Sequence, residues 1–286
     1  MKILYLTKGD HVDYQDDCLF IGLRELFGAD VIDLNQRKHN YVSYDEEAAR
    51  GLYGMGMSVT RVLSDIEVDR TDITSKIKNK YFDYIVYGSI WRCSDYLDKI
   101  LEYYPPNKII LVDGEDEPNI HPLYKEGVVY FKRELRFSEV RIFPISFSIP
   151  TLKVNFVKTN KTRDLAICDP RDKSTYIYKN EKDYYQGYKE SRFGVTTVKA
   201  GWDCMRHYEI LANGCIPAFL NLVSCPVQTM ASFPKQLCLD ALNEYNKGVS
   251  PETVYTKYID KFEAHLLANN TTKAEATKFV DTISSV

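Results

Sequence analysis

The stretch FGVTTVKAGWDCMRHYEILANGCIP, residues 193–217, decides the fold. Residues 193–198 form an apolar, β-branched run that predicts a strand, and a glycine-containing loop follows it. Residues 203–213 then repeat apolar side chains at helical spacing, and Gly214 stands where helices commonly stop. Residues 215–219 return to an apolar run, so the stretch predicts a strand–helix–strand unit of a parallel α/β sheet.

The same alternation of strands and helices continues outward through most of the chain. The first helix has Asp16 or Asp17 as its expected cap and Gly28 as its stop. Residues 35–60 form a long Tyr- and Gly-rich loop, and a loop of that length inside a compact domain is usually functional. The expected strands are residues 3–6, 31–34, 84–87, 109–112, 128–131, 140–143, 165–168, 193–198 and 215–219, and the expected helices are residues 19–27, 94–103, 181–190, 203–213 and two between 251 and 286.

A pause in this alternation divides the chain. Residues 144–161 contain two prolines and a polar stretch, and regular elements resume after them. We therefore expect two domains, residues 1–147 and residues 148–286. The expected fold class is α/β with two doubly wound, Rossmann-like lobes in tandem. A cleft would lie between the carboxyl ends of the two parallel sheets, where ligands bind in such folds.

Composition narrows the class of protein. The chain has 286 residues, 44% hydrophobic and 27% charged, which fits a globular protein and excludes a fibre or a disordered tail. Its net charge of −3 gives no global basic field, so any contact with nucleic acid must be local. The seven cysteines form no Cys-x-x-Cys pair, and no apolar run approaches the roughly 18 residues of a membrane span. We expect a cytoplasmic protein with reduced thiols and no membrane span.

The loop before the 203–213 helix predicts an anion site. Unpaired backbone amides and the positive end of the helix dipole favour a phosphate group there. Gly201 lies in this loop, and Lys199 and Arg206 add cationic side chains that can bind a diphosphate. Glu209 follows Arg206 by three residues, on the same helix face, where its carboxylate could accept hydrogen bonds from ribose hydroxyls.

This segment resembles the donor-binding half of exostosin-like glycosyltransferases. Their pattern is a Ser-x-Phe strand and a Gly-containing loop, followed by Arg-x-x-Glu-Ala-Leu-Ala-x-Gly-Cys-Ile-Pro-Val. The matching positions here are Ser191-Arg-Phe193, Gly201 and Arg206-His-Tyr-Glu209-Ile-Leu-Ala-Asn-Gly214-Cys-Ile-Pro217-Ala. The rest of the chain is similar to a group of bacterial and viral glycosyltransferase-like proteins, through the stretches Asp13-Tyr14, Asp17, Leu52-Tyr53-Gly54-x-Gly56, Asp113-Gly114-Glu115-Asp116 and Tyr130-Phe131-Lys132-Arg133-Glu134.

The resemblance implies a GT-B architecture, in which two Rossmann-like lobes face a cleft. It also implies that the C-terminal lobe binds the nucleotide sugar and the N-terminal lobe the acceptor, and that the enzyme is inverting and uses a UDP-sugar. A viral member would act in the host cytoplasm. Two features depart from the pattern: Ala218 stands where valine is usual, and the chain is short for this architecture.

Glycosyl transfer needs stabilisation of the leaving diphosphate and a base for the acceptor hydroxyl. The sequence has no Asp-x-Asp motif, so we expect no metal cofactor. Lys199, Arg206 and the helix N-terminus would stabilise the leaving group, with Arg133 as a second cationic candidate. Asp13, in the loop after the first strand, is the first candidate for the base, and Glu115 in the acidic run is the second.

Three further residues are candidates for donor contacts, each with a structural alternative. Trp202 would stack on the base or the sugar, as would Tyr53. Asp203 is a candidate ligand, although an aspartate before a helix is more often its N-cap. His207 is either a donor contact or a packed helix residue. Arg206 and Glu209 have their own alternative as a surface ion pair along one helix face.

The acceptor is a glycan or a hydroxymethylated DNA base, since phage DNA glucosyltransferases share the GT-B plan. The net charge argues mildly against DNA, whereas the lysine-rich residues 76–80 and 153–161 leave it open. The alternative function is a non-catalytic module that binds a nucleotide or sugar and needs no base. A Rossmann oxidoreductase lacks support, because no Gly-x-Gly-x-x-Gly follows the first strand. The sequence predicts no oligomeric state.

Overall fold

A computed structural model describes residues 1–9 and 11–286, so Asp10 in the loop after the first strand lies outside the described residues. The α/β class is confirmed. A six-stranded sheet has the order β2-β1-β3-β4-β5-β6, and every neighbouring pair is parallel. Its strands are β1 (Ile3–Leu6), β2 (Val31–Asp33), β3 (Tyr84–Tyr87), β4 (Ile109–Asp113), β5 (Val129–Lys132) and β6 (Ile142–Pro144).

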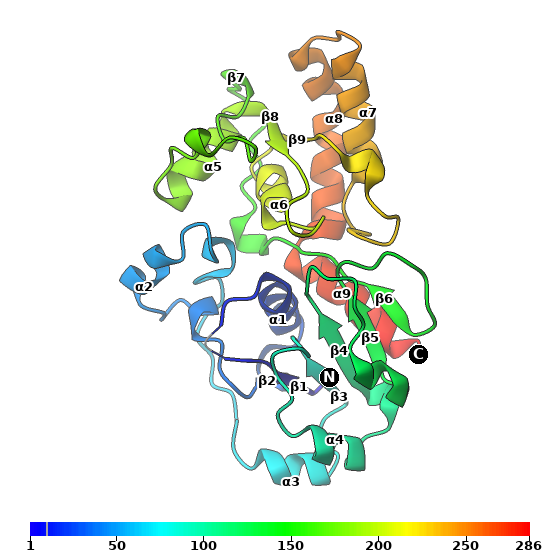
Figure 1. The fold of residues 1–286 in the computed structure, drawn as a ribbon. Coiled ribbons are helices and arrows are strands. Elements are labelled where there is room, and N and C mark those ends of the chain that lie inside the picture. Colours follow the sequence, from blue (N-terminus) through cyan, green and yellow to red (C-terminus); the bar gives the residue numbers. More distant parts are fainter. Residues whose placement is uncertain (10) are drawn as a thin grey trace.

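A second, three-stranded parallel sheet follows in the sequence, with the order β7-β8-β9. Figure 1 shows this sheet and its helices above the larger sheet. Its strands are β7 (Arg163–Leu165), β8 (Ser191–Thr196) and β9 (Ile216–Phe219). The α-helices in the described part of the chain are α1 (Tyr14–Phe27), α2 (Glu46–Gly51), α3 (Ile73–Lys78), α4 (Leu97–Tyr103), α5 (Glu181–Lys189), α6 (Met205–Ala212), α7 (Lys235–Asn246), α8 (Pro251–His265) and α9 (Thr272–Ser284).

Helix α1 begins one turn earlier than expected. Asp13, not Asp16 or Asp17, is its N-cap, and the Asp13 side chain accepts hydrogen bonds from the amides of Gln15 and Asp16. The expected cap residues are themselves helical and buried, because they pair with a buried arginine described below. The stop at Gly28 is confirmed, with φ at 54°, a value that glycine adopts without strain.

Helix α6 also differs from the expectation at its start. Its N-cap is Cys204, which makes no side-chain cap hydrogen bond, and the Asp203 carboxylate turns away to other partners. The seventh strand is shifted as well. It ends at Leu165 instead of Cys168, because the buried residues Ala166 and Cys168 pack in the loop beyond it.

The chain's last helix returns to the first sheet. Helix α9 packs along α1, which lies between the two sheets (Figure 1). The contact is close, since a Cβ at Gly22 would lie 2.1 Å from the carbonyl oxygen of Thr272. The Tyr84 hydroxyl also donates to the carbonyl of Ile283 at 3.1 Å. The division at residue 147 therefore separates the two sheets, while α9 packs with the elements of the first.

One apolar core runs through both halves of the molecule. It joins buried residues of the first sheet, such as Val112, to buried residues of the second, such as Phe193, through α1, α6 and α9. The long 35–60 segment also reaches the second half, where Met57 packs against Tyr184 and other residues of α5 and α6. The two sheets are thus held in one arrangement by packed side chains.

Candidate functional site

A cavity of about 460 Å³ lies between the two sheets. The loops after β1, β4, β5 and β8 line it, so it faces the carboxyl ends of both sheets, the position expected from the topology. Of the predicted site residues, Trp202 and His207 are outside its lining. The other predicted residues all line it: Asp13, Tyr53, Glu115, Arg133, Lys199, Gly201, Asp203, Arg206 and Glu209.

Arg206 is a cation in the wall of this cavity. It lies in the first turn of α6 with 9% of its surface exposed, and one guanidinium nitrogen, Nη2, donates to the Tyr176 hydroxyl at 3.1 Å. The other, Nη1, is buried and has no hydrogen-bond partner within residues 1–9 and 11–286. A buried donor without a partner costs free energy, so such a group in a cavity wall indicates a missing acceptor.

Lys199 approaches the same hydroxyl from the loop after β8. Its Nζ lies 3.4 Å from the Tyr176 hydroxyl and 5.7 Å from the centre of that ring. Among the described residues, Tyr176 is the only hydrogen-bond partner that the side chain of Lys199 or Arg206 has. Sequence reasoning missed Tyr176, because the chain has 22 tyrosines and no motif distinguishes this one from the rest.

Arg133, by contrast, has every guanidinium nitrogen engaged by the protein. Its Nε donates to the Gly114 carbonyl at 2.9 Å, and Nη1 donates to Glu134 at 2.9 Å and to the Asp203 carbonyl at 2.8 Å. Nη2 pairs with Asp116. The side chain is 2% exposed. Arg133 therefore lines the cavity and connects the loop after β5 to Gly114, after β4, and to Asp203, which precedes the N-cap of α6.

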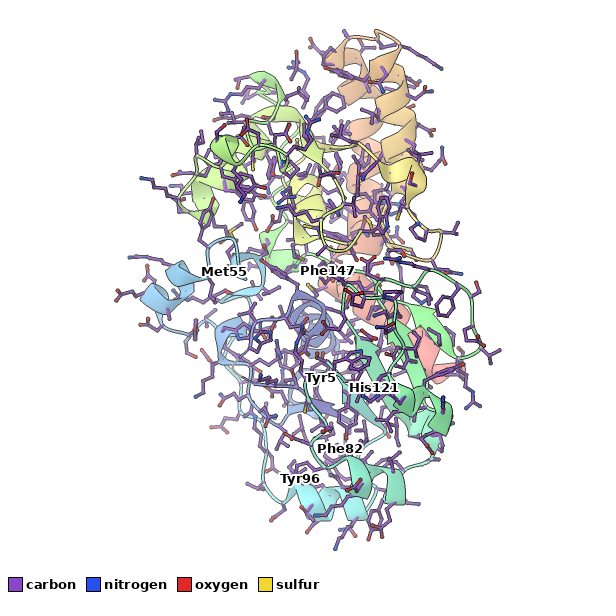
Figure 2. The ribbon with its side chains drawn as sticks, viewed as in Figure 1. Tyr5, Met55, Phe82, Tyr96, His121 and Phe147 are labelled. Atoms are coloured by element: carbon purple, nitrogen blue, oxygen red, sulfur yellow. The ribbon has the colours of Figure 1, made fainter. Side chains whose placement is uncertain are left out.

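Asp203 occupies the other side of this link. Its Oδ2 accepts from the Phe147 amide at 2.7 Å, and Oδ1 accepts from the Tyr208 hydroxyl at 2.9 Å. Burial raises the pKa of the Asp203 carboxyl to about 7. Phe147 lies where the two halves meet (Figure 2), and its ring lies under the Arg133 guanidinium at 4.7 Å. Both carboxylate oxygens of Asp203 thus accept hydrogen bonds where the two halves of the molecule meet.

The two candidate bases share one cation. Arg92 pairs through Nη1 with Asp13 and through Nη2 with Glu115, the second pair at 2.7 Å. Asp13 also caps α1, so both of its oxygens are engaged. Glu115 uses only Oε1 for Arg92, and among the described residues no hydrogen bond reaches Oε2. Sequence reasoning missed Arg92, which follows β3 in a turn without a recognisable motif.

A buried network of charged side chains holds Asp13 in place. Its amide donates to Asp17 Oδ2 at 3.0 Å. Arg37, fully buried, pairs with Asp16 and Asp17 at 2.6 Å each, and His39 Nε2 lies 2.6 Å from Asp17. Burial raises the pKa of Asp16 to about 6. The positive charge of Arg37 lowers this pKa, but by less than burial raises it. The position of Asp13 therefore depends on residues 37–39 of the long loop.

Glu209 is buried on the opposite wall with two hydroxyl partners. Ser58 Oγ donates to its Oε1, and the Tyr184 hydroxyl donates to Oε2 at 3.1 Å. Burial raises the pKa of the Glu209 carboxyl. The alternative of a surface ion pair between Arg206 and Glu209 is wrong, because both residues are buried and Glu209 accepts its hydrogen bonds from neutral hydroxyls. The site thus holds a carboxylate suited to accepting from hydroxyl groups.

His207 and Trp202 lie behind the cavity wall. His207 is fully buried, Nε2 donates to the Trp202 carbonyl at 2.9 Å, and Nδ1 accepts from the Thr196 hydroxyl at 2.8 Å. Burial lowers the pKa of His207 to about 3, so the ring is neutral. The Trp202 ring packs near Phe219, with ring centres 6.4 Å apart. The structure therefore places both residues among packing partners of α6 and β9.

Within residues 1–9 and 11–286, no group of three or more His, Cys, Asp or Glu side chains is arranged to hold a metal ion. No helix in that part of the chain is long and apolar enough to cross a membrane. Comparisons with protein-family models, with curated proteins and with solved structures found no match. The resemblance to exostosin-like glycosyltransferases stays a prediction, and function must be argued from the cavity.

Proposed function

We propose that the protein is a glycosyltransferase that moves a sugar from a nucleotide-diphospho-sugar, with UDP as the expected nucleotide, to an acceptor hydroxyl. The observation that carries the proposal is the buried, unpartnered Nη1 of Arg206 in the wall of a cavity between two parallel sheets. Such a cavity is the usual ligand position in doubly wound folds. We infer a GT-B arrangement, with the sheets as the cores of two Rossmann-like lobes.

The donor diphosphate would bind at the start of α6. Arg206 and Lys199 supply cations that form no ion pair with a carboxylate of the described residues, and Cys204, the N-cap, leaves the first amides of α6 without a side-chain cap. As the bond between the anomeric carbon and the phosphate oxygen breaks, charge develops on the diphosphate. Preorganised cations and amides stabilise that charge. This arrangement supports metal-independent departure of the leaving group.

The acceptor would approach from the opposite wall. A general base must accept the hydroxyl proton, and Glu115 has one carboxylate oxygen free for it, whereas both oxygens of Asp13 are engaged. This geometry favours Glu115 over Asp13, the reverse of the order expected from the sequence. Attack from the wall opposite the diphosphate would invert the anomeric centre.

A specific observation favours a second candidate, the non-catalytic binding module. Arg92 pairs with both candidate bases at once, and a carboxylate paired with a guanidinium is a weaker proton acceptor. A module of this kind would keep the diphosphate contacts and lack transfer. The two candidates therefore agree on the donor site and differ at Glu115.

One experiment separates them. Release of nucleoside diphosphate from a panel of nucleotide sugars is measured in the presence of EDTA, alongside calorimetric binding of UDP. The glycosyltransferase predicts release that Arg206→Ala abolishes, while Arg163→Ala keeps it, because Arg163 is exposed on β7 and pairs with Glu190 away from the cavity. UDP binding without release identifies the module. Absence of nucleotide binding by the folded wild-type protein refutes both.

A further inference from the structure

A second hollow adjoins the cavity on its acceptor side. It has a volume of about 380 Å³ and is lined by Trp91, Arg92, Glu115, Glu117 and Asn119. Arg92 and Glu115 line both spaces, so a group held in the hollow would lie next to Glu115. The hollow therefore adjoins the candidate base at the position proposed for the acceptor.

Trp91 gives this hollow an aromatic wall that is both open and fixed. The side chain is 44% exposed, yet its Nε1 donates to the buried Asp113 at 3.0 Å. The His121 ring meets it edge to face, with ring centres 4.6 Å apart. The anchored N–H sets the orientation of the indole and leaves exposed ring surface for stacking.

The polar groups around Trp91 suit hydroxyls and repel phosphates. Glu115 and Glu117 offer carboxylate oxygens, and Asn119 offers an amide with both donor and acceptor atoms. Among the described residues of the lining, Arg92 is the one cation, and it is already paired with Asp13 and Glu115. A DNA backbone binds through unpaired lysines and arginines, which this wall lacks among the described residues.

We infer that the hollow is the acceptor subsite and that the acceptor is a carbohydrate, not a DNA base. The inference rests on the proposed function. A sugar ring of the acceptor stacks on Trp91 and directs one of its hydroxyl groups to Glu115. The oxygen of this acceptor hydroxyl forms a bond to the anomeric carbon of the donor sugar, and the hydroxyl proton passes to the Glu115 carboxylate. The bond from the anomeric carbon to the phosphate oxygen breaks, and its electron pair leaves with the diphosphate.

The test uses the full chain and a panel of neutral disaccharides and trisaccharides, with a short duplex containing hydroxymethylcytosine as the competing acceptor. Binding is followed by calorimetry, which gives a signal that does not depend on the Trp91 indole. We expect Trp91→Ala to weaken oligosaccharide binding about tenfold or more, the loss of a stacking contact of about 1.4 kcal/mol. Trp91→Phe removes the same N–H but keeps a ring, so it should retain affinity within about threefold.

UDP affinity, measured by calorimetry on the same variants, separates this inference from the proposed function. Loss of oligosaccharide binding with unchanged UDP affinity supports the subsite. If the wild-type chain binds oligosaccharides through Trp91 but binds no UDP, Trp91 belongs to a carbohydrate-binding site and the proposed glycosyltransferase function is refuted. Equal losses in Trp91→Ala and Trp91→Phe overturn the stacking role. Salt-sensitive binding of the duplex, with no response to any oligosaccharide, overturns the carbohydrate acceptor.

Discussion

Tyr176→Phe should make the protein bind a nucleoside diphosphate more tightly. In the structure, the Tyr176 hydroxyl accepts from Arg206 Nη2 at 3.1 Å and from Lys199 Nζ at 3.4 Å, so it engages both of the cations that we assign to the diphosphate. We expect a diphosphate bound to Lys199 and to Arg206 Nη1 to displace this oxygen. The phenylalanine keeps the ring and removes the competitor, so the free protein loses hydrogen bonds that the complex does not need.

The geometry sets the size of the effect. Hydrogen bonds to charged groups contribute about 1.5–3 kcal/mol when well formed. Tyr176 is 43% exposed and the lysine contact is long, so we take a value below that range, about 1 kcal/mol, or about a fivefold lower Kd.

The assay is calorimetric titration with UDP at constant ionic strength. Tyr103→Phe is the control, since that tyrosine lies on α4 and outside the cavity lining. Weaker binding by Tyr176→Phe would refute the competition and show that the hydroxyl donates to the ligand. An unchanged Kd would show that these cations do not meet the diphosphate.

Three further predictions concern the junction and the buried groups. Arg133→Met should cost about 3–5 kcal/mol of unfolding free energy in urea, because it leaves buried Glu134 without its cation, and a cost below about 1 kcal/mol would contradict the structural role. Burial raises the pKa of folded Asp203 to about 7, above its unfolded value, so the folded state binds the proton more tightly. The contribution of protonated Asp203 to the free energy of unfolding is complete below the unfolded pKa and is lost as the pH rises toward 7. Asp203→Asn should therefore flatten the fall in stability between about pH 4 and pH 7, and an unchanged slope would contradict this. Burial lowers the pKa of His207 to about 3, so its ring nitrogen resonances in NMR should show a neutral ring with the proton on Nε2 throughout pH 5–8, and titration within that range would contradict the buried placement.

The central strands of the first sheet were predictable because each is a short apolar run buried on both faces. Residues 3–6, 84–87 and 109–112 were placed within a residue of the observed strands for this reason. Helix starts were less predictable. Several acidic residues precede α1, and which one caps it depends on the pairing of Asp16 and Asp17 with Arg37, a contact between residues far apart in the sequence.

The cavity could be located from the sequence, and its pairings could not. The loop at residues 199–206 predicted an anion site because strand, glycine and helix adjoin in the chain. Whether a cation is free or already engaged depends on distant residues. Arg133 and Arg206 look alike in the sequence, yet the first has all its nitrogens engaged and the second does not. Arg92 and Tyr176 were missed because their partners come from other loops.

A crystal structure grown with UDP tests the central claim most directly. We predict a phosphate oxygen of the nucleotide within hydrogen-bond distance of Arg206 Nη1, in the cavity between the two sheets. The Tyr176 hydroxyl should have moved away from Arg206. UDP bound at another surface, or a cavity without nucleotide at a UDP concentration that saturates the protein in calorimetry, would contradict the account.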